Sequence, residues 1–325
     1  MHIQDGLLDV KTCVGTAVVS VSALGYAIHR VQRSFADRSA PLMGVMAACL
    51  FAAQMMNFPI PGGTSGHLLG GVLAAVMLGP SGGLLVLTVV LAVQCVLFQD
   101  GGITALGANI FNVGVIGSLV GFAIFDPIRR WIGGYRGTVA AAVVAAWFSV
   151  VLGATACSVE LGLSGTYRLG PTLGVMLLVH SIIGLCEALI TGFAIVFVLR
   201  TRPDLVYGQT SESGVLVKSG QVVLAGLAIA LVVAVLLSPF ASQLPDGLDW
   251  SMEKLGVEPQ ATSAALKNLT EKIPMPDYKL SGIPNLNVAG SLAGAIGTLT
   301  VFVVAFLMSR GLSSKTTIAH TPHAS

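Results

Sequence analysis

The chain has 325 residues, of which 54% are apolar and only 10% are charged, against about 25% charged residues in ordinary globular proteins. This composition, with a mean hydropathy of +0.85, excludes a disordered chain and an ordinary soluble domain. The net charge of +2 and the lack of a large basic patch exclude a nucleic-acid binder. The expected fold class is an all-α integral membrane protein, a polytopic helical bundle in a lipid bilayer.

Nine apolar stretches predict transmembrane helices, since a helix of about 20 apolar residues satisfies its own backbone in lipid. In chain order they cover residues 9–30, 42–57, 67–80, 83–98, 107–125, 138–160, 172–199, 219–238 and 287–309. Only the sequence GPSGG separates the third from the fourth. Either is compatible with a tilted or partly re-entrant segment.

The basic residues predict the orientation in the membrane. Short cytoplasmic loops are enriched in lysine and arginine, and 11 of the 17 basic residues fall in alternate connections, at 30–38, 129–136, 200–218 and 310–315. We therefore expect the N-terminus outside and the C-terminus in the cytoplasm. A multi-pass protein of a prokaryotic plasma membrane fits this layout.

A shift in composition divides the chain into two parts. Residues 1–200 predict a seven-helix membrane domain, and the polar segment 201–218 reads as a cytoplasmic linker. Residues 219–325 predict a two-helix domain with a long outside loop at 239–286. This division gives seven helices plus two.

Small residues spaced by four along a helix allow two helices to approach closely. Ala48 and Ala52 form such a pair on the second predicted span. Packing within the bundle is the preferred interpretation of this pair. Contact with another membrane subunit is the alternative.

The first two residues offer three nitrogen atoms that can chelate one metal ion. The Met1 amine and the His2 backbone amide would close a five-membered ring, and the His2 amide with its own Nδ1 would close a six-membered ring. These donors are coplanar, which suits Ni(II) or Cu(II), with Co(II) also possible, whereas zinc prefers a tetrahedron. The alternative is that His2 is only a polar residue on a loose terminus.

A fourth ligand is available in the loop NFPIPGGTSGH at 57–67, which ends at His67. Its prolines and glycines predict a tightly turned loop in which backbone approaches backbone closely. Because this loop is expected on the same face as the N-terminus, it could bring His67 to Met1. A histidine that merely ends a helix is the alternative.

A second outside loop, FQDGGITALGANIFN at 98–112, carries Gln99, Asp100, Asn109 and Asn112. Such polar groups could orient a histidine ligand through its free ring nitrogen. Helix capping by Asp100 and Asn109 explains the same residues equally well.

His180 and Glu187 are seven residues apart and therefore share one face of the seventh predicted span. Ionisable residues inside a membrane are usually functional or paired, so these two suggest either a proton relay or structural hydrogen bonds. The structural interpretation is preferred. The sequence contains no P-loop motif and no constellation of catalytic residues, so we expect neither an enzyme nor a chain that hydrolyses ATP by itself.

The sequences MHIQDGLL, NFPIPGGTSGHLLGG, FQDGGITALGANIFN and GLCEALIT together resemble the CbiM/NikM family over residues 1 to about 200. This family comprises the substrate-capture components of nickel and cobalt energy-coupling factor transporters. The resemblance implies that the Met1 amine, the His2 amide and imidazole, and His67 hold a transported Ni(II) or Co(II) ion in square-planar nitrogen coordination. No prosthetic group is implied, and the choice between nickel and cobalt stays open.

The sequence PDGLDWSMEKLG at 245–256 is similar to the PDGLE motif of a small partner subunit, here fused to the chain. Asp249 stands where the motif has glutamate. The resemblance further implies a scaffold membrane subunit and two cytoplasmic ATPase subunits as partners. Two alternatives remain: a proton-coupled secondary metal transporter that uses His180 and Glu187, and a structural membrane subunit whose histidines bind no metal.

Overall fold

The computed structural model describes residues 1–34, 39–208, 219–256 and 270–312. Parts of the predicted linker (209–218), of the predicted outside loop (257–269) and of the C-terminal segment (313–325) lie outside the described residues. The long helices are α1 (Val10–Ser34), α2 (Ser39–Gln54), α3 (Gly71–Phe98), α5 (Gly121–Ile132), α6 (Gly134–Leu163), α7 (Leu169–Thr201), α8 (Ser219–Val232) and α11 (Leu286–Leu312). The shorter elements are β1 (Phe58–Ile60), β2 (Thr64–Gly66), α4 (Leu106–Asn109), η1 (Ile110–Val120), η2 (Pro203–Leu205), η3 (Val233–Leu237), η4 (Ser238–Phe240), α9 (Gly247–Leu255) and η5 (Pro276–Tyr278).

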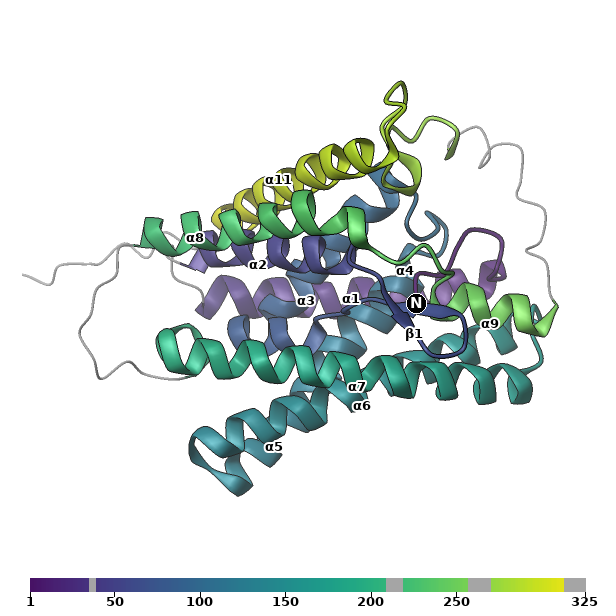
Figure 1. Ribbon diagram of the computed structural model, residues 1–325. Coiled ribbons are helices and arrows are strands. Elements are labelled where there is room, and N and C mark those ends of the chain that lie inside the picture. The colour runs from purple at the N-terminus through teal and green to yellow at the C-terminus, as the bar shows by residue number, and fades with distance from the viewer. Residues whose placement is uncertain (35–38, 209–218, 257–269, 313–325) are drawn as a thin grey trace, which may run out of the picture.

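Seven helices in the described part of the chain are long and apolar enough to cross a membrane, and Ala40–Gln54 forms a shorter apolar helix. Elements α4, η1 and α5 join into one of these helices, Leu106–Ile132. The helices run side by side in a bundle (Figure 1). The polytopic helical fold predicted from the sequence is therefore confirmed, whereas the orientation and the count of nine spans stay predictions.

The third and fourth predicted spans are two arms of α3, which reverses at Gly79. The backbone of Gly79 is non-helical (φ 77°, ψ 161°), a conformation that favours glycine. A Cβ added to Gly83 would lie 2.9 Å from the backbone nitrogen of Ala75, so the two arms lie against each other. The first arm, residues 71–78, rises only about 12 Å. It is too short to cross a hydrocarbon core of about 30 Å by itself.

The C-terminal part of the chain, the predicted second domain, packs against the predicted first domain through small residues. Ala48 and Ala52 of α2 form a buried cluster with Ala230 and Ala234 of the α8–η3 helix. Helix α11 packs along α2 on the same side of the bundle (Figure 1). The prediction that Ala48 and Ala52 serve packing within the chain is confirmed.

One end of the bundle, which we call the site end, carries residues 1–9, the β1–β2 hairpin, loop 99–105 and α9. The N-terminus lies there beside β1 and α9 (Figure 1). The hairpin pairs Phe58 with Gly66 and Ile60 with Thr64, so the all-α prediction is wrong at this short antiparallel sheet. Its Gly62 and Gly63 have positive φ angles of 108° and 85°, which allow the chain to turn tightly between the strands.

Candidate metal site

The N-terminal segment is inserted into the bundle rather than loose. Only 3% of Met1, 5% of His2 and none of Ile3 is exposed. The Asn109 side chain accepts a hydrogen bond from the Ile3 amide at 2.8 Å and donates one to the Ile3 carbonyl at 3.1 Å. The Gly102 amide donates to the same carbonyl at 2.8 Å. The alternative in which His2 sits on a loose terminus is therefore wrong.

Loop 99–105 holds the following residues of this segment in place. The Asp5 carboxylate accepts hydrogen bonds from the amides of Ile103 and Thr104, at 3.1 and 2.8 Å, and from the Thr104 hydroxyl at 2.6 Å. A Cβ on Gly102 would collide with the Asp5 backbone. Glycine is thus needed where the loop approaches the terminus.

The Met1 amine forms an ion pair with Asp246, which comes from the second domain. The amine nitrogen lies 3.3 Å from Asp246 Oδ2, while Oδ1 caps α9 by accepting hydrogen bonds from the amides of Leu248 and Asp249. Burial disfavours the charged amine, but the Asp246 carboxylate outweighs this effect and raises the amine's pKa above its ordinary value. Burial likewise opposes ionisation of Asp246, but the Met1 ammonium and the Asp249 amide lower its pKa to about 2.

His2 is oriented by a carboxylate and stacked on the second histidine. Its Nδ1 lies 2.9 Å from Asp100 Oδ1, and the Tyr278 hydroxyl donates to Asp100 Oδ2 at 2.5 Å. The His2 and His67 rings are parallel, with centroids 5.2 Å apart. Burial opposes the ionised form of Asp100, but His2 and the Tyr278 hydroxyl lower its pKa well below the usual range. The buried His2 Nε2 has no hydrogen-bond partner among the described residues.

His67 follows β2 and is held by its own backbone and by α7. Its Nδ1 lies 3.0 Å from the Leu68 carbonyl, so the tautomer that donates there carries its lone pair on Nε2. The two Glu187 oxygens accept hydrogen bonds from the amides of Leu69 and Gly70, at 2.7 and 2.8 Å. Burial, the Met1 amine and His2 lower the pKa of His67 to about 4. His67 is therefore neutral at physiological pH, as a metal ligand must be.

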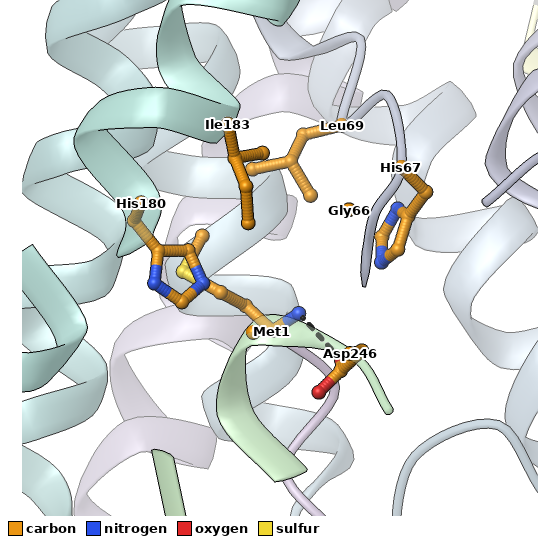
Figure 2. A pocket seen from close by; sticks show the side chains of 8 residues that line it. Met1, Gly66, His67, Leu69, His180, Ile183 and Asp246 are labelled. Atoms are coloured by element: carbon orange, nitrogen blue, oxygen red, sulfur yellow. Dashed lines mark hydrogen bonds and ion pairs between the residues drawn. The ribbon is translucent and has the colours of Figure 1, made fainter. Parts of the chain in front are cut away.

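A small cavity joins these groups. Figure 2 shows His67 on one side of it and His180 on the other, with Met1 between the two histidines. Its volume is about 10 Å³, roughly the space that one water-sized particle needs. No three His, Cys, Asp or Glu side chains of the described residues are close enough to hold a metal ion. A metal site here must therefore include the terminal amine or backbone atoms.

The four polar residues of loop 98–112 have different positions. Asp100 contacts His2, and Asn109 holds the adjacent residue Ile3. The Asn112 amide instead donates to Glu160 at 2.7 Å, and Gln99 is exposed at the end of α3. Two of the four thus reach the N-terminal segment, and neither Asp100 nor Asn109 serves as a helix cap.

Sequence reasoning missed two residues of the second domain at this site, Asp246 and Tyr278. Asp246 lies in the quoted PDGLD sequence, but only the segment's docking reveals its position: the Ser65 amide donates to the Pro245 carbonyl at 2.8 Å. Tyr278 has a positive φ of 57°, which is uncommon for a residue other than glycine. No sequence pattern marked it.

Comparison with known proteins identifies relatives along the whole chain. Residues 2–205 match the family described as CbiM, cobalt uptake substrate-specific transmembrane region, and residues 220–314 match the PDGLE domain. A putative fused nickel transport protein NikMN of Archaeoglobus fulgidus is 36% identical, over 95% of this chain and 98% of the relative. A probable fused nickel transport protein LarMN of Lactiplantibacillus plantarum is 31% identical, over 97% and 98%.

A solved structure is similar to part of this chain. It is a crystal structure of a truncated transition metal transporter, with a TM-score of 0.57 and 34% sequence identity. The match covers 62% of this chain and 99% of that chain. Much of this chain's arrangement therefore recurs in a protein described as a transition metal transporter.

Proposed function

This chain belongs to the CbiM family, with a PDGLE domain at its C-terminal end, and on that premise we propose that it is the substrate-capture component of an ATP-driven importer of Ni(II) or Co(II). It is a multi-pass membrane protein of the nickel and cobalt transport class rather than an enzyme. The ion binds at the site end of the bundle, from outside, with high affinity.

The observation that carries this proposal is the burial of the terminal amine beside two histidines. The Met1 amine and His67 line one cavity, and the His2 ring is stacked on His67. The proposed donors are the Met1 amine, the His2 amide nitrogen and Nδ1, and His67 Nε2. Four nitrogens in a plane suit Ni(II), and Co(II) tolerates the same donors.

Chelation requires the His2 ring to turn. In this structure Nδ1 of His2 faces Asp100, whereas the six-membered chelate needs Nδ1 on the metal. A half-turn about χ2 exchanges Nδ1 with Cδ2 while the ring fills the same space. The turn also moves Nε2 to the Asp100 side, where the carboxylate can accept its proton in a hydrogen bond, as outer partners of metal-bound histidines do.

Metal binding also competes with the ion pair between Met1 and Asp246. An ammonium group has no lone pair, so the amine must lose its proton before it binds the ion. Asp246 then becomes a nearby negative charge that offsets part of the charge of the divalent ion. Contact of the second domain with the amine is therefore compatible with capture.

The sequence has no ATP-binding motif, so an ATP-driven importer would need partner subunits to hydrolyse ATP. The proposed partners are a scaffold membrane subunit and two cytoplasmic ATPase subunits. The test is uptake of radioactive nickel and cobalt by cells that express the chain with and without these subunits. The proposal expects uptake that needs both ATPases and is lost in His67→Ala, while His29→Ala transports normally. Uptake by the chain alone, driven by a proton gradient, would contradict it.

The proton-coupled alternative has less support, because His180 and Glu187 have separate partners. His180 Nδ1 lies 2.9 Å from the Met176 carbonyl, and both Glu187 oxygens bind backbone amides of the His67 loop. These contacts fit the preferred structural interpretation of the pair. No hydrogen bond between the two is found among the described residues.

A further inference from the structure

His180 is a buried histidine that the proposed planar site does not use. It lies in α7, about 16 Å along the helix from Leu169, and only 1% of it is exposed. It nevertheless lines the cavity that Met1 also lines and that His67 faces from the opposite side (Figure 2). A polar ring at this depth in a membrane bundle needs a partner, and ionisable residues in such places usually have a function.

The hydrogen bonding of His180 prepares its second nitrogen for a metal. Nδ1 lies 2.9 Å from the Met176 carbonyl, which has no proton to give, so the imidazole must donate. In the neutral ring the lone pair is then on Nε2. A backbone carbonyl that fixes the tautomer and orientation of the ring is the usual outer partner of a metal-bound histidine.

The surroundings of the ring leave Nε2 facing the cavity. The missing side chain of Gly247 would lie 3.0 Å from His180 Cε1, the carbon between the two ring nitrogens, so α9 packs tightly against the tip of the imidazole. Figure 2 shows one ring nitrogen of His180 turned toward Met1. Among the described residues no hydrogen bond to Nε2 is found, and the remaining cavity walls include the apolar side chains of Leu69 and Ile183.

We propose that His180 provides one ligand of a second position for the transported ion, which we call the His180 position. There the ion is held by the Met1 amine, His67 Nε2 and His180 Nε2 before it enters the planar chelate. This inference rests on the proposed function, because the ion is the same Ni(II) or Co(II). Only two side chains and the amine take part, which agrees with the absence of any group of three metal-binding side chains among the described residues.

The chemistry of the His180 position suits transient binding. Its three donors bind without removal of the His2 amide proton, so an arriving ion can be held before the planar set forms. Asp246 also lines the cavity and supplies a negative charge beside the amine. The shared donors Met1 and His67 allow the ion to pass to the chelate by exchanging His180 for the nitrogens of His2. Such a position lowers the barrier that the ion crosses on its way into and out of the planar chelate. Binding and release are then faster by the same factor, and the affinity of the chelate for the ion is unchanged.

The first test measures rates on the purified full chain with a C-terminal tag. Ni(II) is mixed with the protein, the planar absorption band is followed as it grows, and its decay is followed after addition of EDTA. We expect His180→Gln to slow both the growth and the decay of the planar band by the same factor, about tenfold or more. A tenfold change corresponds to an increase of about 1.4 kcal/mol in one barrier that binding and release share. The final band should be unchanged. His29→Gln, a histidine far from the site end, is the matched control.

Two results would overturn the inference. If His180→Gln binds and releases Ni(II) at the rates of the unchanged chain, His180 is not on the path. If the folded variant loses the planar band, His180 belongs to the primary site or only supports it. A failure of the proposed function looks different, because then the unchanged chain itself binds no Ni(II).

A second variant gives a positive signal that does not depend on rates. His2→Ala disables the chelate, and His180→Cys in the same chain places a thiolate ligand at the His180 position. With Co(II), we expect a near-ultraviolet thiolate-to-cobalt charge-transfer band that His2→Ala alone does not show. If the double variant folds and shows no such band, the His180 position does not exist.

Discussion

The carboxylate of Glu187 is expected to hold His67 in its binding geometry. Both of its oxygens accept hydrogen bonds from consecutive amides, those of Leu69 and Gly70, at 2.7 and 2.8 Å. In Glu187→Gln only the amide oxygen can accept, while the new NH₂ group faces the second amide donor. One buried N–H is then left unsatisfied, which costs about 1–3 kcal/mol.

This cost predicts the loss of metal affinity. If the free energy is needed to keep the loop in the binding geometry, Ni(II) affinity falls by about 5- to 150-fold. The assay is calorimetric titration of Ni(II) into the purified chain, together with its melting temperature. Glu160→Gln is the control, because Glu160 is also buried but accepts from Asn112 instead, and it should bind Ni(II) normally.

Two outcomes would refute this reasoning. If Glu187→Gln binds Ni(II) with unchanged affinity and melts at the same temperature, the carboxylate does not hold the loop. If binding persists while uptake in cells loses a dependence on the pH gradient, the proton-coupled alternative gains. Uptake that follows the ATPase subunits excludes that alternative.

Three further predictions concern the ligands and their neighbours. One residue added before Met1 should abolish Ni(II) binding, because it replaces the amine ligand and does not fit beside a cavity of about 10 Å³. The measurement is bound metal per chain, and retained binding would contradict this prediction. The chelate releases the amine proton and the His2 amide proton, so affinity should fall by about 100-fold per pH unit below the raised pKa of the amine and by about tenfold per unit above it. Asp246→Asn keeps the helix cap but removes the charge that raises the amine's pKa, so the steeper fall should begin at lower pH. Titrations from pH 6 upward, about one unit apart, would show an unshifted curve if this is wrong. Asp100→Asn should weaken Ni(II) binding by about 10- to 100-fold. Tyr278→Phe should weaken it by only about two- to tenfold. If titrations show the larger loss of affinity in Tyr278→Phe, the proposed orientation of His2 by Asp100 is refuted.

Much of the fold was predictable because lipid imposes a simple rule on the sequence. Each predicted span needed only a long apolar run, and the structure has helices there. The reversal of α3 at Gly79 was harder, since the GPSGG sequence marks a break but does not give its angle. The hairpin at residues 58–66 was predicted only as a tight loop, because three-residue strands leave no periodic pattern.

The site was partly predictable because adjacent residues form the chelate. Met1 and His2 are neighbours in sequence, so covalent geometry alone suggests their joint use. Asp246 and Tyr278 lie more than 240 residues after the N-terminus in the sequence. Only the docking of the second domain brings them close to the N-terminal segment. The hydrogen bonds from the Leu69 and Gly70 amides to Glu187 also depend on which face of α7 meets the loop that carries His67. Helical periodicity does not specify that face.

The central claim is that the Met1 amine, His2 and His67 hold one transported ion. The most direct measurement loads the purified chain, tagged only at its C-terminus, with Ni(II) or Co(II) and records bound metal and the absorption spectrum beside His2→Ala and His67→Ala. We predict one equivalent of metal and a yellow, square-planar Ni(II) band that both variants lose. A folded chain that binds no metal, or binds it equally well without either histidine, would contradict the claim.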